Sequence, residues 1–269
     1  MSRLSAEQRA FYETFGFLVF RQLFSADEMD AITREAEAVL QDGLGGQPFT
    51  GQRRHMVLGF VEQRPRLAGL VEDDRIYEVV SDLLGPDLVW ITSDGNYYVG
   101  DTQWHPDAGG MLPSYHLIKI ALYLDPVRKD SGCLRVIPGS HREPFHSALR
   151  PLQKHRGETP VYPFGATGEQ IPAYPLESDP GDVVLFNQAL WHASFGGGNR
   201  RRMFTLNFTA APKTEEEVGL HRKLYEGHLR HQQSNPYRQL DRVYEPGFLT
   251  GGGPRRRSMV RQLVEWGFR

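Results

Sequence analysis

The sequence has a single cysteine, Cys133, and no long run of apolar residues. One cysteine excludes an internal disulfide bond and suits a reducing compartment. A membrane-spanning helix needs about 20 predominantly apolar residues in succession, and no stretch of the chain approaches that length. The first 20 residues include Glu7 and Glu13 and have no uninterrupted apolar run, which is not the pattern of a signal peptide. We therefore expect a cytoplasmic protein.

The chain also lacks a strong excess of charge, since its formal net charge over 269 residues is −2. This balance gives no reason to expect nucleic acid or an anionic membrane as a partner. Arg255, Arg256 and Arg257 form a basic run, but it is short and has no interleaved aromatic residues. Such a run is typical of a surface face or an oligomer contact. We expect a small-molecule substrate, no nucleic-acid or membrane partner, and a monomer or small homo-oligomer.

Helix signals gather at the two ends of the chain. Ser5 and Gln8 have the spacing of a capping box, and this helix should end near Gly16. Ser25 is a good N-cap for a second helix to about Leu40. We expect further helices over residues 75–84, from about 215 to 233 and from about 258 to 268, and a mobile loop over residues 43–54.

The middle of the chain has strand signals instead of helix signals. Its short strand-like runs are separated by Gly, Pro and Asp. The runs are "LVWITS", "NYYVG", "LIKIALYLD", "LRVIPGS", "GDVVLFNQ" and "RMFTLNFTA", and an earlier short strand is expected at "FLVFRQL". This spacing predicts an antiparallel sandwich or barrel rather than βαβ units. Residues 141–175 are expected to form a long excursion of the kind that serves as a lid or binding loop.

His105 and Asp107 lie two residues apart in "GDTQWHPDAGG". In an extended segment this spacing directs both side chains to the same side. His192, between a strongly β-prone run and a Gly-rich turn, is the best candidate for a third ligand. Two His and one carboxylate leave one face of a metal open, as in non-haem Fe(II) oxygenases. A solvated turn with an incidental His–Asp pair is the alternative interpretation.

An arginine cluster stands close after His192. An Fe(II) oxygenase needs two further electrons to activate O₂, and 2-oxoglutarate is a common source whose far carboxylate needs an anchor. Arginine suits this role because its planar fork binds carboxylates through two parallel hydrogen bonds. Strand alternation places Arg201 on a mixed face and Arg202 on an apolar face that suits packing against helices. This favours Arg201 as the anchor, while three arginines on a solvated hairpin remain the alternative.

The chain resembles the phytanoyl-CoA dioxygenase family of Fe(II)/2-oxoglutarate oxygenases. The matching segments are "FYETFGFLVFRQLFSADEMDAI", "WHPD", "IALYLDPVRKDSGCLRVIPGSHR", "PGDVVLFNQALWHAS" and "RRRMFTLNF". They occur in order from about residue 8 to residue 210, and the pair "SGCLRVIPGSHR" and "GDVVLF…WHAS" is the most specific part.

The resemblance implies a mainly β fold with flanking helices, the double-stranded β-helix or cupin-like jelly roll. We expect one domain over residues 1–269, with N-terminal helices to about residue 85, a jelly-roll core over about 86–212 and a C-terminal helical extension from about 213. The resemblance also implies a set of site residues. These are His105, Asp107 and His192 as iron ligands, Arg201 on the distal carboxylate of 2-oxoglutarate, and Ser194 and Lys119 as further co-substrate contacts.

The implied activity is that of an Fe(II)/2-oxoglutarate-dependent dioxygenase, with O₂ as the second co-substrate. Halogenating relatives replace the carboxylate with a small residue, so the presence of Asp107 favours hydroxylation. We expect a small polar or anionic metabolite as substrate, with Asn96, Tyr98, Thr102 and Gln103 as candidate contacts. Two alternatives stay open at this point: a cupin-like isomerase or hydrolase that does not use 2-oxoglutarate, and an acyl-CoA hydroxylase within the same family.

Overall fold

The computed structural model describes residues 3–153, 165–166 and 168–269. Its helices are α1 (Ala6–Phe15), α2 (Ala26–Asp42), α3 (Pro65–Gly69), α4 (Asp74–Leu84), α5 (Phe145–Ala148), α6 (Glu215–Gln233), α7 (Pro246–Thr250) and α8 (Pro254–Glu265). Its strands are β1 (Phe17–Phe20), β2 (His55–Leu58), β3 (Val89–Tyr98), β4 (Thr102–His105), β5 (Leu117–Tyr123), β6 (Leu134–Val136), β7 (Tyr174–Leu176), β8 (Val183–Asn187), β9 (His192–Ser194) and β10 (Arg201–Thr209). Within these ranges no helix is both long enough and apolar enough to cross a bilayer.

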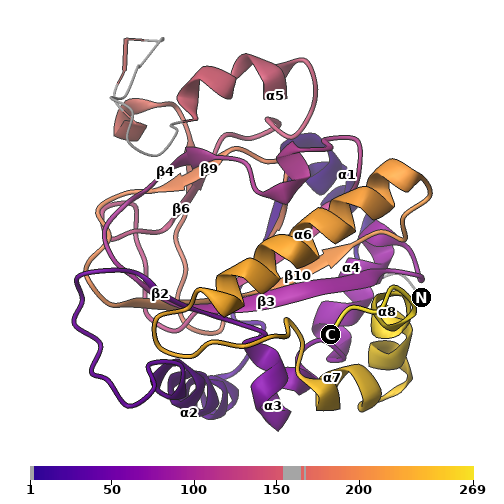
Figure 1. Cartoon of the computed structure of the whole chain (residues 1–269). Helices are drawn as coiled ribbons and strands as arrows, with labels where there is room; N and C mark the ends of the chain where they lie inside the picture. Colours follow the sequence, from indigo (N-terminus) through magenta and orange to yellow (C-terminus); the bar gives the residue numbers. More distant parts are fainter. Residues whose placement is uncertain (1–2, 154–164, 167) are drawn as a thin grey trace.

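The strands form two antiparallel sheets. The larger has the order β1-β8-β5-β10-β3-β2, and the smaller has the order β4-β9-β6-β7. Figure 1 shows α2, α3, α7 and α8 on one side of the long strands β3 and β10, with α6 running along these strands. The prediction of a mainly β fold with flanking helices is confirmed.

The helix starts predicted from the sequence are present. Ser5 and Gln8 form the capping box of α1, which ends at Gly16 in the left-handed conformation with φ +86°. Ser25 caps α2 together with Glu28, and this helix continues to Asp42, slightly beyond the expected end. In each box the side chain of the cap and that of the third helical residue satisfy backbone N–H groups that lack a helical partner.

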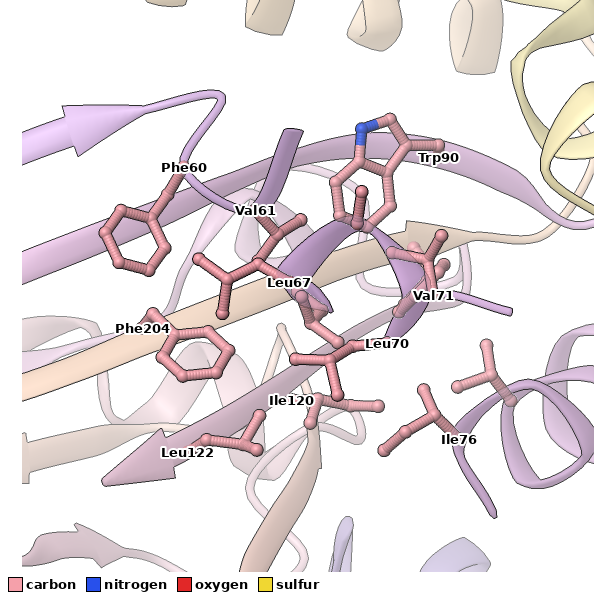
Figure 2. Packing of buried hydrophobic residues seen from close by; sticks show 14 of the residues in the cluster. Phe60, Val61, Leu67, Leu70, Val71, Ile76, Trp90, Ile120, Leu122 and Phe204 are labelled. Atoms are coloured by element: carbon pink, nitrogen blue, oxygen red, sulfur yellow. The ribbon is translucent and has the colours of Figure 1, made fainter. Parts of the chain in front are cut away.

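The main hydrophobic core lies between the helices and the outer face of the larger sheet. Phe204, Leu206 and Phe208 alternate along β10 and are buried there, and α3 and α4 supply Leu67 and Ile76 to the same cluster. Figure 2 shows Phe204 of this cluster together with Leu67 and Ile76, and with Ile120 and Leu122 of β5. Burying one such side chain stabilises the fold by about 1.5–3 kcal/mol, so this layer fixes the orientation of β10. The opposite face of β10 is thereby directed between the two sheets.

A second cluster fills part of the space between the sheets. It includes Tyr123 and Phe186 from the larger sheet and Val136 and Leu176 from the smaller one. Cys133 is fully buried in this cluster, where burial raises the pKa of its thiol to about 11. The thiol is therefore protonated and is part of the packing.

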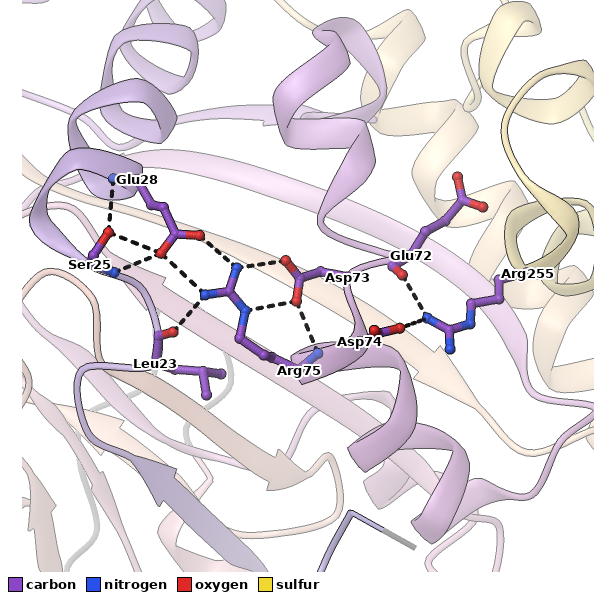
Figure 3. A network of polar contacts seen from close by, with 8 residues as sticks. All are labelled: Leu23, Ser25, Glu28, Glu72, Asp73, Asp74, Arg75 and Arg255. Atoms are coloured by element: carbon purple, nitrogen blue, oxygen red, sulfur yellow. Dashed lines mark hydrogen bonds and ion pairs between the residues drawn. The ribbon is translucent and has the colours of Figure 1, made fainter. Parts of the chain in front are cut away.

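A polar network joins the N-terminus of α2 to α4. The guanidinium of Arg75 pairs with Glu28 at 2.8 Å and with Asp73 at 2.7 Å, and it also donates to the carbonyl of Leu23 (Figure 3). Hydrogen bonds from Arg75 hold the pKa of Glu28 at about 2. Nearby, Arg255 of the basic run pairs with Asp74 and Glu78.

Several elements differ from the prediction. The runs "LVWITS" and "NYYVG" contribute to one continuous strand, β3, because Asp94 and Gly95 between them follow the extended backbone instead of turning. The expected loop over residues 43–54 is followed at once by β2, whose four residues gave no distinct signal. Residues 141–175 contain α5 and the start of β7, and residues 154–164 and 167 of the expected lid lie outside the described part of the chain.

Candidate metal centre

The two predicted histidine ligands lie opposite each other on paired strands. His105 at the end of β4 is the register partner of His192 at the start of β9, and their ring centroids are 4.4 Å apart. This pairing explains how residues 87 positions apart in the chain reach one point. The side chain of His192 is almost fully buried, whereas that of His105 is one-third exposed.

Both imidazoles are held by the same local contact. Nδ1 of His105 is 2.7 Å from the carbonyl oxygen of Gln103, and Nδ1 of His192 is 2.8 Å from that of Leu190. A carbonyl only accepts, so each Nδ1 carries the proton and each Nε2 presents a lone pair. This orientation of a histidine by a backbone carbonyl is typical of metal sites, where it fixes the coordinating nitrogen.

Asp107 completes the cluster from the segment after β4. Its backbone N–H donates to the carbonyl of Gln188, which fixes the turn that brings the carboxylate inward. Its oxygens lie 4.0 Å from Nε2 of His105 and 3.6 Å from Nε2 of His192. One donor atom from each of the three residues falls within 4.8 Å of the others, close enough for all to bind one ion.

The charge state of this cluster suits a cation. Burial alone would raise the pKa of Asp107, but Lys119 and the two histidines hold it well below its usual range. Burial lowers the pKa of His192 to about 4. At neutral pH the cluster therefore offers an ionised carboxylate and a neutral imidazole, which are the forms that bind metals. Apart from its ion pair with Lys119 at 2.7 Å, Oδ2 of Asp107 has no hydrogen-bond partner in the part of the chain that the structure describes.

Arg201, the predicted anchor for 2-oxoglutarate, lies at the start of β10 with its side chain between the sheets. It is 7% exposed, and its Nε and Nη1 atoms have no hydrogen-bond partner among the described residues. Its guanidinium lies 5.1 Å from the ring centre of Tyr98, its register partner on β3. Arg202 points the other way and pairs with Asp125 and Glu37. The alternation predicted from the sequence is therefore the one observed.

Two glycines make room for the Arg201 guanidinium. A Cβ atom on Gly132 would lie 1.7 Å from Nη1 of Arg201, and one on Gly197 would lie 2.2 Å from it. Ser194 supports the same corner, since its hydroxyl donates to the carbonyl of Gly132 at 2.9 Å. The chain thus forms a close-fitting seat around an arginine that has no carboxylate partner within the described ranges. Such a seat fits a ligand carboxylate, because an unpaired buried charge is costly.

The cluster and Arg201 open into one cavity of about 370 Å³ between the sheets. Of the predicted substrate contacts, Tyr98 and Thr102 line it, as do Ser194 and Lys119. Asn96 and Gln103 do not. Asn96 is fully buried against Arg54 and Asp94, and Gln103 uses its carbonyl to hold His105.

The unpredicted residues of the cavity lining include two charged residues and a histidine: Arg54, Asp94 and His228. A signal existed for Asp94, because it shares the parity of Asn96 and Tyr98 on β3. Arg54 lies in an irregular segment and His228 on a helix far along the chain. Nothing in the local pattern of either points to the cavity.

A pair of imidazoles with one carboxylate and no thiolate has the donor chemistry of a non-haem iron site rather than of a structural zinc site. The residues present fit a metal ion and 2-oxoglutarate. The three donor atoms converge on one point, and the seat of Arg201 fits a carboxylate.

Comparisons with known proteins agree with this class. The family model for phytanoyl-CoA dioxygenase (PhyH) matches residues 12–204. An ectoine dioxygenase of Sphingopyxis alaskensis is 27% identical over 218 residues, which are 72% of this chain and 71% of that protein. One of Bordetella bronchiseptica is 29% identical over 175 residues, 58% of this chain, and the match spans about half (53%) of that relative. The structure of HygX from Streptomyces hygroscopicus with nickel and 2-oxoglutarate bound aligns with a TM-score of 0.59 at 22% identity, covering 79% of this chain and 89% of that one.

The chain belongs to the phytanoyl-CoA dioxygenase (PhyH) family, as its sequence segments predicted. It is of the class expected from the sequence, the non-haem iron and 2-oxoglutarate-dependent dioxygenases.

Proposed function

We propose that His105, Asp107 and His192 hold Fe(II) and that Arg201 binds the distal carboxylate of 2-oxoglutarate. When bound, these two groups supply the oxidation of a substrate carbon by O₂, with succinate and CO₂ as the other products. The observation that carries the proposal is the buried Arg201, which has two unpartnered nitrogens in the same cavity as the His–Asp–His cluster.

The residues of the chain act mainly by positioning. The carbonyls of Gln103 and Leu190 keep both Nε2 atoms directed at one point, so no reorganisation is needed when a metal binds. The glycine seat fixes the fork of Arg201, which sets the orientation of a bound dicarboxylate. Ser194 and Lys119 remain proposed further contacts of the co-substrate.

We propose hydroxylation of a small polar or anionic metabolite. A cavity of about 370 Å³ is at the small end for ligand sites, and the metal and 2-oxoglutarate would occupy part of it. This favours a small metabolite over an acyl-CoA thioester. The ectoine dioxygenases among the relatives are named for a small substrate, which supports the same size class. A cytoplasmic location and a monomer or small homo-oligomer remain predictions.

The experiment is to load the protein with Fe(II) without oxygen and then add 2-oxoglutarate. Chelation of the metal by the co-substrate gives a weak visible charge-transfer band, which we expect with the native chain and not with Asp107→Ala. A folded, iron-loaded protein that gives no band would favour an isomerase or hydrolase that uses the same ligands without 2-oxoglutarate.

A further inference from the structure

We propose that the substrate is an anion and that Arg54 binds its negatively charged group. Arg54 is then a specificity-determining residue of this enzyme. The inference deepens the proposed function and rests on it, because it assumes that the metal and 2-oxoglutarate occupy the His–Asp–His cluster and Arg201.

Arg54 immediately precedes β2 and lines the cavity. Its side chain is 41% exposed, which places it where the cavity meets solvent. Three residues of β3 hold it. Its Nε donates to Oδ1 of Asn96 at 2.8 Å, and its guanidinium lies 4.1 Å from the ring centre of Tyr98. Its Nη2 is also 3.8 Å from Oδ2 of Asp94.

The residues that hold Arg54 are themselves fixed. The side-chain amide of Asn96 donates to Oδ2 of Asp94 at 2.6 Å, so Asn96 bridges the carboxylate and the guanidinium. The hydroxyl of Thr205 on β10 donates to the other oxygen of Asp94 at 2.5 Å. A partly exposed arginine is usually mobile, and ordering it costs conformational entropy. Here the contacts with β3 already order Arg54 in the folded protein, as expected of a group that binds a ligand.

The charged side chains around the cavity sum to one net positive charge. Among the described residues its lining contains the cations Arg54, Lys119 and Arg201. It contains two carboxylates, Asp94 and Asp107. A divalent metal and the dianion 2-oxoglutarate cancel each other. The loaded cavity therefore retains one net positive charge, and a substrate with one negative charge neutralises it.

The lining histidine outside the metal centre does not change this balance. Burial lowers the pKa of His228 to about 4, so it is neutral at pH 7. The buried Nδ1 of His228, on α6, has no hydrogen-bond partner among the described residues. This histidine gives the substrate a further polar contact without adding charge.

Arg54 is a better candidate for the substrate anion than the other two cations. Arg201 is assigned to 2-oxoglutarate, and Lys119 is already in an ion pair with Asp107. The contact of Arg54 with its carboxylate, 3.8 Å to Asp94, is longer than that of Lys119, and Asp94 is shared with Asn96 and Thr205. Its planar fork matches a carboxylate, phosphonate or phosphate group.

The test uses the whole chain loaded with Fe(II) and saturating 2-oxoglutarate without oxygen. Methylphosphonate and acetate serve as minimal anions and acetamide as the neutral counterpart of acetate. Binding is measured by the change in the visible band and by the shift in melting temperature. We expect both anions to bind and acetamide not to bind. Arg54→Gln should weaken anion binding about 10- to 100-fold, as expected for loss of a charged hydrogen bond, and Arg54→Lys should recover part of the affinity.

Arg53→Gln is the matched control. It removes the same charge at the neighbouring residue, whose side chain is exposed and does not line the cavity. It should bind the anions like the native chain. Equal binding of acetamide and acetate, no anion binding by the native protein, or equal anion binding by Arg54→Gln would each overturn the inference. All three outcomes are read on a protein that shows the visible band. Absence of the band in the native protein is a separate result, which counts against the proposed function itself.

Discussion

Nζ of Lys119 lies 2.7 Å from Oδ2 of Asp107, so a buried lysine faces the carboxylate of the candidate metal centre. Both side chains are less than one-fifth exposed. Lys119 reaches this point from β5, where it is the register partner of Asn207 on β10 and Phe186 on β8. The ammonium group of Lys119 thus balances the negative charge of Asp107, as a bound metal ion would.

This relationship predicts a metal-dependent stability effect for Lys119→Met. Without the metal, the change leaves Asp107 as a buried carboxylate whose nearest cation is lost, and we expect a destabilisation of about 3 kcal/mol. With Fe(II) bound, the metal compensates the carboxylate and most of this cost should disappear. Urea unfolding of the metal-free and anaerobically loaded proteins measures both values. Lys129→Met, at an exposed position, is the control. An equal cost in both states would show that Lys119 stabilises something other than Asp107.

Arg201→Gln and Arg202→Gln form a matched pair of neighbours on opposite faces of β10. Arg201→Gln should abolish the visible band with 2-oxoglutarate while Fe(II) still binds, because only the carboxylate anchor is lost. Arg202→Gln should keep the band and lower the stability by about 1 kcal/mol, since its partners Asp125 and Glu37 are partly exposed. Anaerobic titration followed by absorbance distinguishes them. A normal band from Arg201→Gln would remove Arg201 from its proposed role.

Gly132→Ala should weaken 2-oxoglutarate binding although it replaces no residue proposed to bind the metal or 2-oxoglutarate. Its added Cβ would lie 1.7 Å from Nη1 of Arg201, and the φ of +87° disfavours a side chain there. The guanidinium must therefore move, and we expect the KM for 2-oxoglutarate to rise about tenfold or more. Gly198→Ala is the control, because nothing lies within 4 Å of the added atom. If both variants have the native KM, the seat does not determine the position of Arg201.

Much of the candidate site was predictable from local pattern. The spacing of His105 and Asp107 and the alternation of Arg201 and Arg202 depend only on how an extended chain presents side chains. The pairing of His105 with His192 is a long-range register. It was reached through the family resemblance and the donor chemistry, not through periodicity.

The substrate side of the cavity was less predictable, for a physical reason. Arg54 is held by Asn96, Asp94 and Tyr98, residues more than 35 positions away, and its own segment has no regular structure. His228 faces the cavity only because α6 packs along the larger sheet. Side chains placed by tertiary packing leave no periodic signal in the sequence. For the same reason Asn96, predicted as a substrate contact, instead supports Arg54.

Buried histidines predict that the metal-free protein loses stability in mild acid. Burial lowers the pKa of His221 to about 4, as it does for His116, His192 and His228. In the unfolded chain a histidine has a pKa of about 6.5, so between about pH 6.5 and pH 4 the unfolded state binds more protons than the folded state. The stability is therefore fully present above about pH 6.5 and falls as the pH drops toward 4, by up to about 2 kcal/mol per histidine at pH 5.

His221→Gln tests this away from the metal centre, because glutamine can still bond to the hydroxyl of Tyr115, 3.1 Å from Nε2 of His221. Unfolding free energies at pH 7.5 and pH 5 should differ by about 1–2 kcal/mol less in the variant than in the native chain. An unchanged difference would mean that His221 takes up its proton in the folded protein as readily as in the unfolded one.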